Sequence, residues 1–176
     1  MDPSFNARLR PWVTVGSTIT GLLLGLTSCG SSDAVDSEKD PWSRVVVEGE
    51  FSLELPSQLA VGPETGTDSL YRTYRSDDLV VSIDYGWYSN SLRDVAGDDL
   101  ERATIRVDGR SATHVRFRDR AAESGLEYVV ELHVPDTGKG QVKLTLVARA
   151  RSEQDRDRAE RILRSVRFLS GTQQID

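Results

Sequence analysis

The sequence has few of the residues that usually carry chemistry or cross-links. It contains one cysteine, so the chain can form no internal disulfide bond. Its two histidines, His114 and His133, fall short of the three or four ligands of a zinc site, and neither has a second ligand at useful spacing. No Gly-x-Ser-x-Gly nucleophile elbow or glycine-rich phosphate loop occurs. We therefore expect a protein that is not an enzyme and holds no metal or cofactor.

The chain also has fewer basic residues than acidic ones. The chain has 22 lysines and arginines against 28 aspartates and glutamates, a formal net charge of −6 at pH 7. Nucleic acids and anionic lipid surfaces attract proteins with an excess of basic residues. The charge balance therefore excludes nucleic acid as a partner and argues against direct adhesion to anionic lipid.

The sequence has no apolar run long enough for a membrane-spanning helix, which needs about 20 residues. Its longest run, Val13–Leu26, has about 14 residues and contains three glycines. Arg8 and Arg10 precede the run, and small residues follow it up to Ser28. A basic segment, a short apolar segment and small residues are the three parts of a secretory signal. We expect residues 1–28 to be a cleaved signal peptide.

The tetrapeptide Leu26-Thr27-Ser28-Cys29 at the end of this signal resembles a bacterial lipobox. The resemblance implies cleavage between Ser28 and Cys29 and lipidation of Cys29. Lipoproteins of this kind carry several acyl chains, such as palmitate, on that cysteine. Each buried CH₂ contributes about 0.8 kcal/mol to membrane binding, so several chains together give a stable anchor. The residue that follows Cys29 is Gly30 and not an aspartate. By resemblance to the sorting signals of Gram-negative lipoproteins, this favours the outer membrane. The alternative is an ordinary secreted protein with an unpaired cysteine.

The remaining chain divides into a polar tether over residues 29–40, one domain over 41–170 and a frayed tail over 171–176. Alternating apolar residues predict strands, and apolar residues spaced three and four apart after Ser152 predict a C-terminal amphipathic helix. The fold class expected is α+β, a mostly antiparallel sheet with that helix packed on one face. The strands are expected at 45–48, 51–55, 70–75, 79–85, 104–107, 110–118, 126–134 and 142–150, with a short helix near 92–100.

Both histidines are predicted on the outward face of the meander formed by the last strands. Cross-strand pairing would then place His114 opposite Glu131, and Arg118 opposite Glu127. One interpretation is a histidine–carboxylate site of the kind used by a general base or a metal. The other, which we favour, is a solvated sheet face with ion pairs that contribute little.

The segment Tyr85-Gly86-Trp87-Tyr88-Ser89-Asn90 places three aromatic residues in a predicted loop after a buried strand. Exposed aromatic residues in loops often anchor a partner or a small ligand. Tyr85, Trp87, Tyr88 and Asn90 are therefore the candidate binding residues. The alternative is that Trp87 and Tyr88 cap the edge of the core beneath the loop.

Three elements resemble the PsbP/Mog1-like superfamily, which includes small bacterial lipoproteins of the DcrB type. They are the strand Phe51–Pro56, the hairpin around Val107-Asp108-Gly109-Arg110, and the strand-to-helix unit from Lys143 to Phe168. The resemblance covers about residues 44–169. It implies an antiparallel sheet with helices packed on it, in proteins that serve as assembly or binding subunits without a shared catalytic site.

The leading functional hypothesis is a lipid-anchored, extracytoplasmic protein that acts as a non-catalytic binding or assembly module for another envelope protein. Its membrane contact would be the lipid on Cys29, on the periplasmic face of the outer membrane if the cell is Gram-negative. The alternative is a small-ligand-binding protein or an envelope enzyme that uses the Tyr85–Asn90 loop with Asp84.

The lipobox leads to a direct labelling experiment. In cells grown with labelled palmitate, the wild-type protein should take up label and Cys29→Ala should not, because the acyl chains attach to that cysteine. Ser31→Ala serves as the control and should be labelled like the wild type. Equal labelling of Cys29→Ala and the wild type would contradict the anchor.

Overall fold

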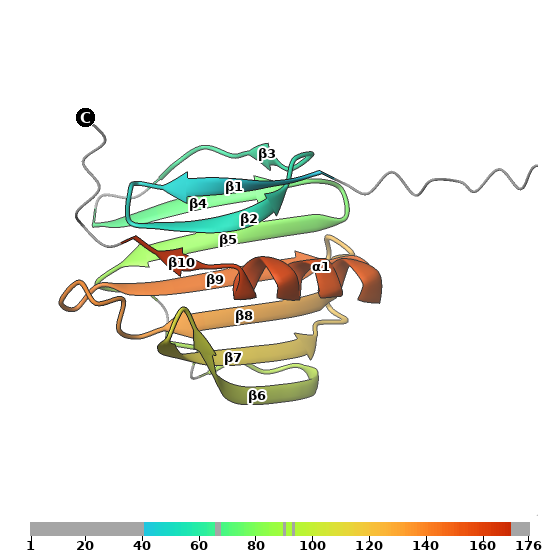
Figure 1. Cartoon of the computed structure of the whole chain (residues 1–176). Coiled ribbons are helices and arrows are strands. Elements are labelled where there is room, and N and C mark those ends of the chain that lie inside the picture. Colours follow the sequence, from blue (N-terminus) through green and yellow to red (C-terminus); the bar gives the residue numbers. More distant parts are fainter. Residues whose placement is uncertain (1–40, 66–67, 90, 93, 170–176) are drawn as a thin grey trace, which may run out of the picture. The chain divides into compact units, whose positions relative to one another are not determined.

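The structure is a computed structural model that describes residues 41–65, 68–89, 91–92 and 94–169 (Figure 1). The predicted signal peptide, Cys29, the tether, Asn90 and the tail lie outside the described residues. Within them, the fold is α+β, with antiparallel sheets and one helix near the C-terminus, as the sequence predicts.

A seven-stranded antiparallel sheet forms the larger layer. Its strands are β3 (Ala60–Val61), β4 (Ser69–Arg75), β5 (Leu79–Gly86), β6 (Asp98–Val107), β7 (Arg110–Arg118), β8 (Tyr128–Val134) and β9 (Lys143–Ala150). They are ordered β3-β4-β5-β9-β8-β7-β6. The strand β9 therefore lies in the middle of the sheet, between β5 and β8, which are far apart in sequence. The segment 87–97 carries the chain from β5 to the edge strand β6.

A second layer covers one face of this sheet. It consists of a small sheet, ordered β1-β2-β10, and the helix α1 (Figure 1). Its elements are β1 (Trp42–Val47), β2 (Phe51–Pro56), α1 (Glu153–Arg164) and β10 (Arg167–Phe168). The strands predicted at 45–48 and 51–55 correspond to β1 and β2, which pair as a hairpin. Gly49 in its turn has a φ of 70°, which favours glycine. The two-residue strands β3 and β10 were not predicted.

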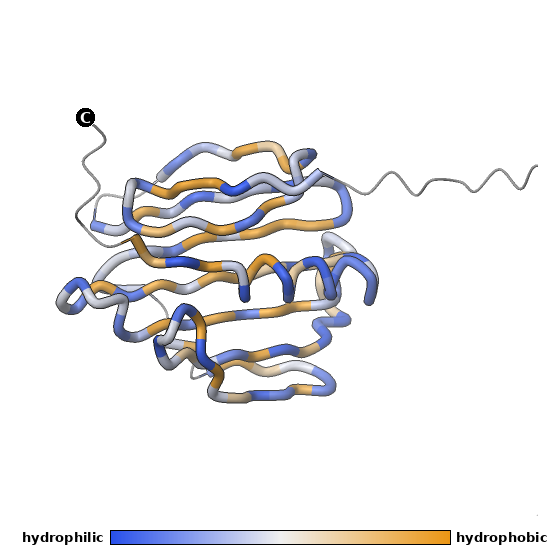
Figure 2. The backbone as a smooth tube through the Cα atoms, viewed as in Figure 1, coloured by the Kyte–Doolittle hydropathy of each residue, from blue (hydrophilic) through white to orange (hydrophobic). Residues whose placement is uncertain are grey.

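The hydrophobic core lies between the two layers. The predicted stripe of α1 is fully buried, with Ala159, Ile162, Leu163 and Val166 all at 0% exposure. It packs on β8 and β9, where Leu132, Leu144 and Leu146 are also fully buried. In Figure 2 the outward side of α1 is largely hydrophilic. One amphipathic helix thus closes the central part of the sheet, because its apolar side faces the sheet and its charged side faces water.

The start of α1 follows its sequence signal. Ser152 is the N-cap, and its hydroxyl oxygen accepts a hydrogen bond from the Asp155 backbone N–H at 3.2 Å. The same hydroxyl donates to the Asp155 carboxylate at 2.5 Å. Such a cap satisfies a backbone donor that has no partner within the helix. The helix therefore begins directly after Ser152, as the sequence predicts.

The short helix predicted near 92–100 is wrong. Its last residues belong to β6, which begins at Asp98 rather than at Thr104, and the described residues of 91–97 are not helical. Leu92 has a φ of 57°, outside the helical range. A Cβ at Gly97 would lie 2.2 Å from the Phe117 ring, so the backbone approaches the sheet too closely for a helix. Tertiary packing overrides the local charge pattern here.

The two histidines lie on opposite faces of the sheet, which corrects the prediction that they share one. His114 is opposite Leu132, and Glu131 is opposite Val115. His114 therefore lies on the helix-covered face, and His133 lies two residues from Glu131 on the other face. The predicted pairing was wrong by one residue of register, and each such shift reverses the face.

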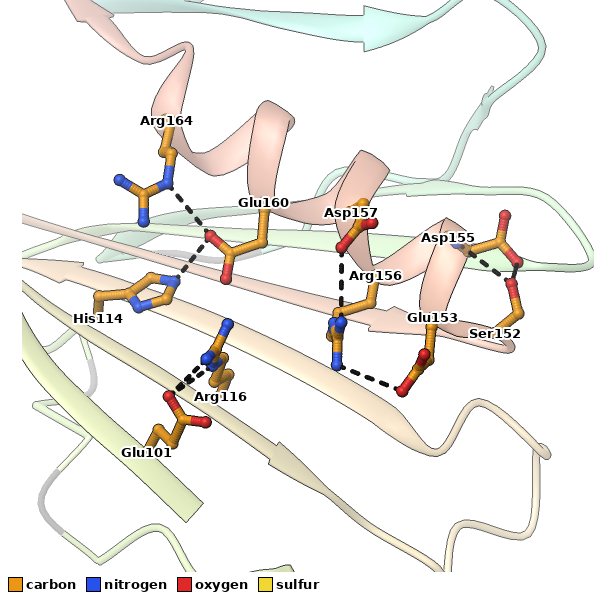
Figure 3. Close-up of polar contacts among 10 residues, drawn as sticks. All are labelled: Glu101, His114, Arg116, Ser152, Glu153, Asp155, Arg156, Asp157, Glu160 and Arg164. Carbon is orange, nitrogen blue, oxygen red and sulfur yellow. Dashed lines mark hydrogen bonds and ion pairs between the residues drawn. The ribbon is translucent and has the colours of Figure 1, made fainter. Parts of the chain in front are cut away.

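His114 instead joins β7 to the helix. Its Nε2 lies 3.0 Å from Oε2 of Glu160, and Nε of Arg164 lies 3.3 Å from the same oxygen (Figure 3). Burial tends to raise the pKa of the Glu160 carboxyl, but the hydrogen bond and charge of His114, with help from Arg164, outweigh burial and lower this pKa below 4.5. This contact joins α1 to β7, a strand on which the apolar stripe of the helix does not pack.

The lowered pKa of Glu160 predicts how stability depends on pH. A depressed folded-state pKa stabilises the fold above the ordinary value of 4.5, and this contribution is lost as the pH falls through the folded-state value. Glu160→Gln should therefore lower the free energy of unfolding by about 1–2 kcal/mol near neutral pH. The difference from the wild type should shrink in acid, as measured by urea unfolding.

Glu153→Gln is the matched control, because Glu153 lies on the same helix with its side chain 71% exposed. Removing such an exposed charge should change stability by less than about 0.5 kcal/mol. Equal effects of the two substitutions would show that the His114–Glu160 contact does not fasten the helix.

Candidate functional site

The seven-stranded sheet has a second face, which neither α1 nor the small sheet covers. We call it the helix-free face. Strand register places one polar row across it, because directly opposed residues of antiparallel strands share a face. The row runs Thr113, His133, Thr145, Asp84, Tyr71. Polar residues of five strands thus meet on one surface, which their separation in sequence did not reveal.

One half of the helix-free face is covered by the segment that joins β5 to β6. Leu92 is 1% exposed and belongs to a small second core with Val115, Phe117 and Val129, against which Val95 packs. This core secures the segment over β7 and β8. Tyr71, on β4 in the other half, keeps 41% of its surface exposed.

That other half contains a shallow depression of about 270 Å³. Its lining residues are Tyr71, Ser82, Asp84, Thr145, Val147 and Arg149. They come from β4, β5 and β9 and combine an aromatic ring, hydroxyl groups and one charge of each sign. Nη1 of Arg149 lies 3.1 Å from Oδ2 of Asp119, which fixes the guanidinium at one end of the depression.

A chain of hydrogen bonds runs beneath the rim of this depression. Ser89 donates to the backbone carbonyl of Asp84 at 3.2 Å, its Oγ lies 2.5 Å from Oγ1 of Thr145, and that oxygen lies 2.9 Å from Nδ1 of His133. One set of directions satisfies all three contacts: His133 donates to Thr145, and Thr145 donates to Ser89. Ser89 thereby ties the end of the β5 turn to the sheet.

These hydrogen-bonded side chains are not arranged for nucleophilic catalysis. Ser89 is 3% exposed, and its proton points to a carbonyl group rather than to a base. Burial, followed by the charge of Lys143, lowers the pKa of His133 below 6.5, against a smaller opposing effect of Asp84. His133 is therefore neutral near pH 7. The hydrogen bonds of Ser89, Thr145 and His133 hold the turn after β5 to the sheet.

Trp87 and Tyr88 lie in the turn that the hydrogen bonds of Ser89 hold to the sheet. Their exposures are 59% and 80%, so neither residue caps the core. The turn begins directly after β5, and Ser89 connects its other end to two residues that line the depression. Two large aromatic side chains are thus presented to solvent from a fixed piece of backbone.

Tyr85 does not belong with these two aromatic residues. It lies opposite Leu144, and its ring centroid is 5.4 Å from that of Phe51 in the main core. Its hydroxyl donates to Glu50 at 3.2 Å. Burial, with the charge of Glu50, raises the pKa of Tyr85 to about 12. The structure therefore divides the predicted site: Tyr85 packs on the helix-covered side, and Trp87 and Tyr88 are in the solvent-exposed turn.

Glu131 is a residue of the helix-free face that the sequence placed in a solvated position. It is 7% exposed, and its Oε2 is buried without a hydrogen-bond partner. Burial raises its pKa above 4.5, against the opposing charges of Arg149 and Arg102. The alternation along β8 assigned it correctly to the face opposite the core, but only the covering segment and the second core explain its burial.

Charged residues also gather on the helix-covered side, between α1 and the strands β6 and β7 (Figure 3). Arg116 bonds to Glu101 at 2.6 and 2.9 Å. Arg156 lies 3.9 Å from Glu153 and 3.6 Å from Asp157. Arg118 lies opposite Tyr128 and not opposite Glu127 as predicted, but its Nε still donates a hydrogen bond to Glu127 at 2.8 Å. Since each arginine has a carboxylate partner, we assign these residues to the packing of α1 and not to a ligand site.

The described part of the chain contains no group of three histidine, cysteine, aspartate or glutamate side chains placed to hold a metal ion. In the same part, no helix has both the length and the apolar character needed to cross a membrane. Comparison with protein-family models, with curated proteins and with solved structures found no match in any of the three.

The burial of Glu131 gives a prediction opposite in sign to that for Glu160. A raised folded-state pKa stabilises the fold below the ordinary value of 4.5, and this contribution is lost as the pH rises through the folded-state value. Glu131→Gln removes the ionisation. The variant should therefore gain stability relative to the wild type on going from about pH 4 to about pH 7, as measured by urea unfolding.

Glu123→Gln, at an exposed position of the β7–β8 connection, is the control and should follow the wild type at both pH values. A Glu131→Gln variant that loses stability relative to the wild type over the same range would show that the carboxylate is instead held by its neighbouring arginines.

Proposed function

We propose that this chain is a lipid-anchored, extracytoplasmic protein that acts as a non-catalytic binding or assembly module in the bacterial envelope. Its partner is another envelope protein, which docks on the turn that carries Trp87 and Tyr88. The observation that supports this proposal is the exposure of these two rings, 59% and 80%, on a turn that Ser89 holds to the sheet.

Large aromatic rings are costly to expose to water, and covering them with a partner is favourable. Trp and Tyr are enriched among the residues that contribute most to protein–protein binding, because they bury much surface with little loss of side-chain freedom. The hydrogen bonds of Ser89 to Asp84 and Thr145 fix the backbone of the turn before a partner arrives. A preorganised turn reduces the entropy lost on binding.

The non-catalytic part of the proposal is supported by the polar chain beneath the turn. Ser89 donates to a carbonyl group and is buried, and His133 is held neutral. The localisation rests on the lipobox resemblance of Leu26–Cys29. We further propose that the domain is PsbP/Mog1-like, because the antiparallel sheet with a C-terminal helix agrees with what that resemblance implies.

Site-specific photocrosslinking tests the docking turn. We would replace Trp87 or Tyr88 with p-benzoylphenylalanine in the full chain, irradiate intact cells and identify the adducts by mass spectrometry. Both positions should give an adduct with the same envelope protein. Trp87→Ala should weaken binding of that protein by about 30-fold, the effect of losing about 2 kcal/mol at an interface centre.

Val61 provides the matched control, because it is 66% exposed but lies on the edge strand β3 rather than in the turn. A photocrosslinker at Val61 should give no adduct with that protein. The proposal is wrong if Trp87 and Tyr88 give no protein adduct, or if the control position gives the same adducts as the turn.

A second function, binding of a small ligand, is favoured by one specific observation. The depression beside the turn is lined by polar groups of β4, β5 and β9 and has a volume of about 270 Å³. Its lining includes Asp84, which the sequence suggested as a nearby acid for a ligand site.

A further inference from the structure

We infer that the depression on the helix-free face binds one sugar ring of an envelope glycan. The inference goes beyond the proposed protein partner, since it uses Tyr71, Asp84 and Arg149 and needs neither Trp87 nor Tyr88. It develops the small-ligand alternative by naming the class of ligand. The polar groups, the aromatic surface and the shape of the depression each suit such a ring.

The polar groups of the depression suit a neutral ligand with many hydroxyl groups. Asp84 can accept hydrogen bonds, Arg149 can donate them, and the Ser82 hydroxyl can do either. The lining residues carry one charge of each sign, and Arg149 is also paired with Asp119, so the depression has no excess of positive charge that would attract an anion. A hydroxyl group both donates and accepts, and adjacent hydroxyl groups of a sugar can use a carboxylate and a guanidinium together.

The charges are also held in place before a ligand arrives. The contact between Arg149 and Asp119 fixes the guanidinium, and the hydrogen bond from Ser89 to the Asp84 carbonyl group fixes the backbone from which the carboxylate projects. This backbone belongs to β5, an interior strand between β4 and β9. Groups on rigid strands lose little freedom when a ligand binds.

Tyr71 supplies the aromatic surface. It lies directly opposite Asp84 in the β4–β5 register, on the same face, and is 41% exposed. The aliphatic side of a sugar ring carries C–H groups with partial positive charge, which are attracted to the negative face of an aromatic ring. A sugar lying on Tyr71 would direct its hydroxyl groups toward Asp84 and Ser82. The half-buried Val147 adds an apolar contact on the floor.

The shape fits a ring that belongs to a longer chain. The depression is shallow, and its volume of about 270 Å³ is below the range of roughly 300–1,000 Å³ usual for sites that enclose a drug-sized ligand. A partly enclosed ring leaves room for the glycan to continue along the sheet surface on both sides. Binding of one ring with this much exposure should be weak, with a Kd of the order of 1 mM.

The test uses the full chain, folded and anchored in detergent, with chitotetraose and cellotetraose as probes. Binding is followed by isothermal titration calorimetry and by quenching of tyrosine and tryptophan fluorescence. We expect at least one probe to bind, and Tyr71→Ala and Asp84→Asn each to weaken it by at least about tenfold. These variants should retain the crosslink at Tyr88.

Leu100→Ala is the matched control, because Leu100 is 43% exposed, close to the exposure of Tyr71, but lies on β6 at the opposite edge of the sheet. It should bind the sugar like the wild type. Thermal unfolding shows whether Tyr71→Ala and Asp84→Asn are folded, and the conservative Tyr71→Phe, which keeps the ring, should retain most of the binding.

Two results would overturn the inference. One is the absence of binding by either probe up to about 10 mM, ten times the expected Kd. The other is binding that Tyr71→Ala and Asp84→Asn leave unchanged, which would place the sugar elsewhere. Absence of a crosslink at Trp87 and Tyr88 together with sugar binding would contradict only the proposed protein partner. The two proposals can therefore fail independently.

Discussion

The burial of β9 against α1 is the contact on which the rest of the structure depends. The strand occupies the centre of the large sheet, and its inward residues Leu144, Leu146, Ala148 and Ala150 are all fully buried. Burying one leucine side chain contributes about 1.5–3 kcal/mol. Because α1 follows β9 directly and folds back over it, a single connection closes the core. The small sheet then covers the part of this face that the helix leaves open.

This arrangement gives the two faces of the sheet different tasks. The helix-covered face is filled by apolar packing and by polar contacts between α1 and β7, such as the hydrogen bond between His114 and Glu160. Neither α1 nor the small sheet covers the other face, so polar residues of β5, β8 and β9 can meet there. Its exposed half combines an aromatic ring with both signs of charge, next to two exposed rings on a fixed turn. Binding chemistry is therefore concentrated on the side that the core does not need.

The predictable parts of the fold were those set by local periodicity. The strands β2, β4, β5, β7, β8 and β9, the cap at Ser152 and the buried apolar stripe of α1 follow from alternation, a capping residue and helical spacing. The failures share one cause. A short helix was predicted near 92–100, but pairing of β6 with β7 and close packing of Gly97 on Phe117 decided the conformation of this segment. Strand pairing between distant segments is not encoded in any short window of sequence.

The sequence by itself determined the acidic charge, the single cysteine, the lipobox-like tetrapeptide and the strand and helix composition, because each depends only on which residues are present and how they are spaced. The candidate site needed the tertiary structure. The register of β7 with β8 separated His114 from Glu131, and the placement of β9 beside β5 brought Thr145 to Asp84 and Ser89. Burial of Glu131 and exposure of Trp87 were likewise decided by packing, because neighbours across the sheet, and not neighbours along the chain, determine which side chains reach water.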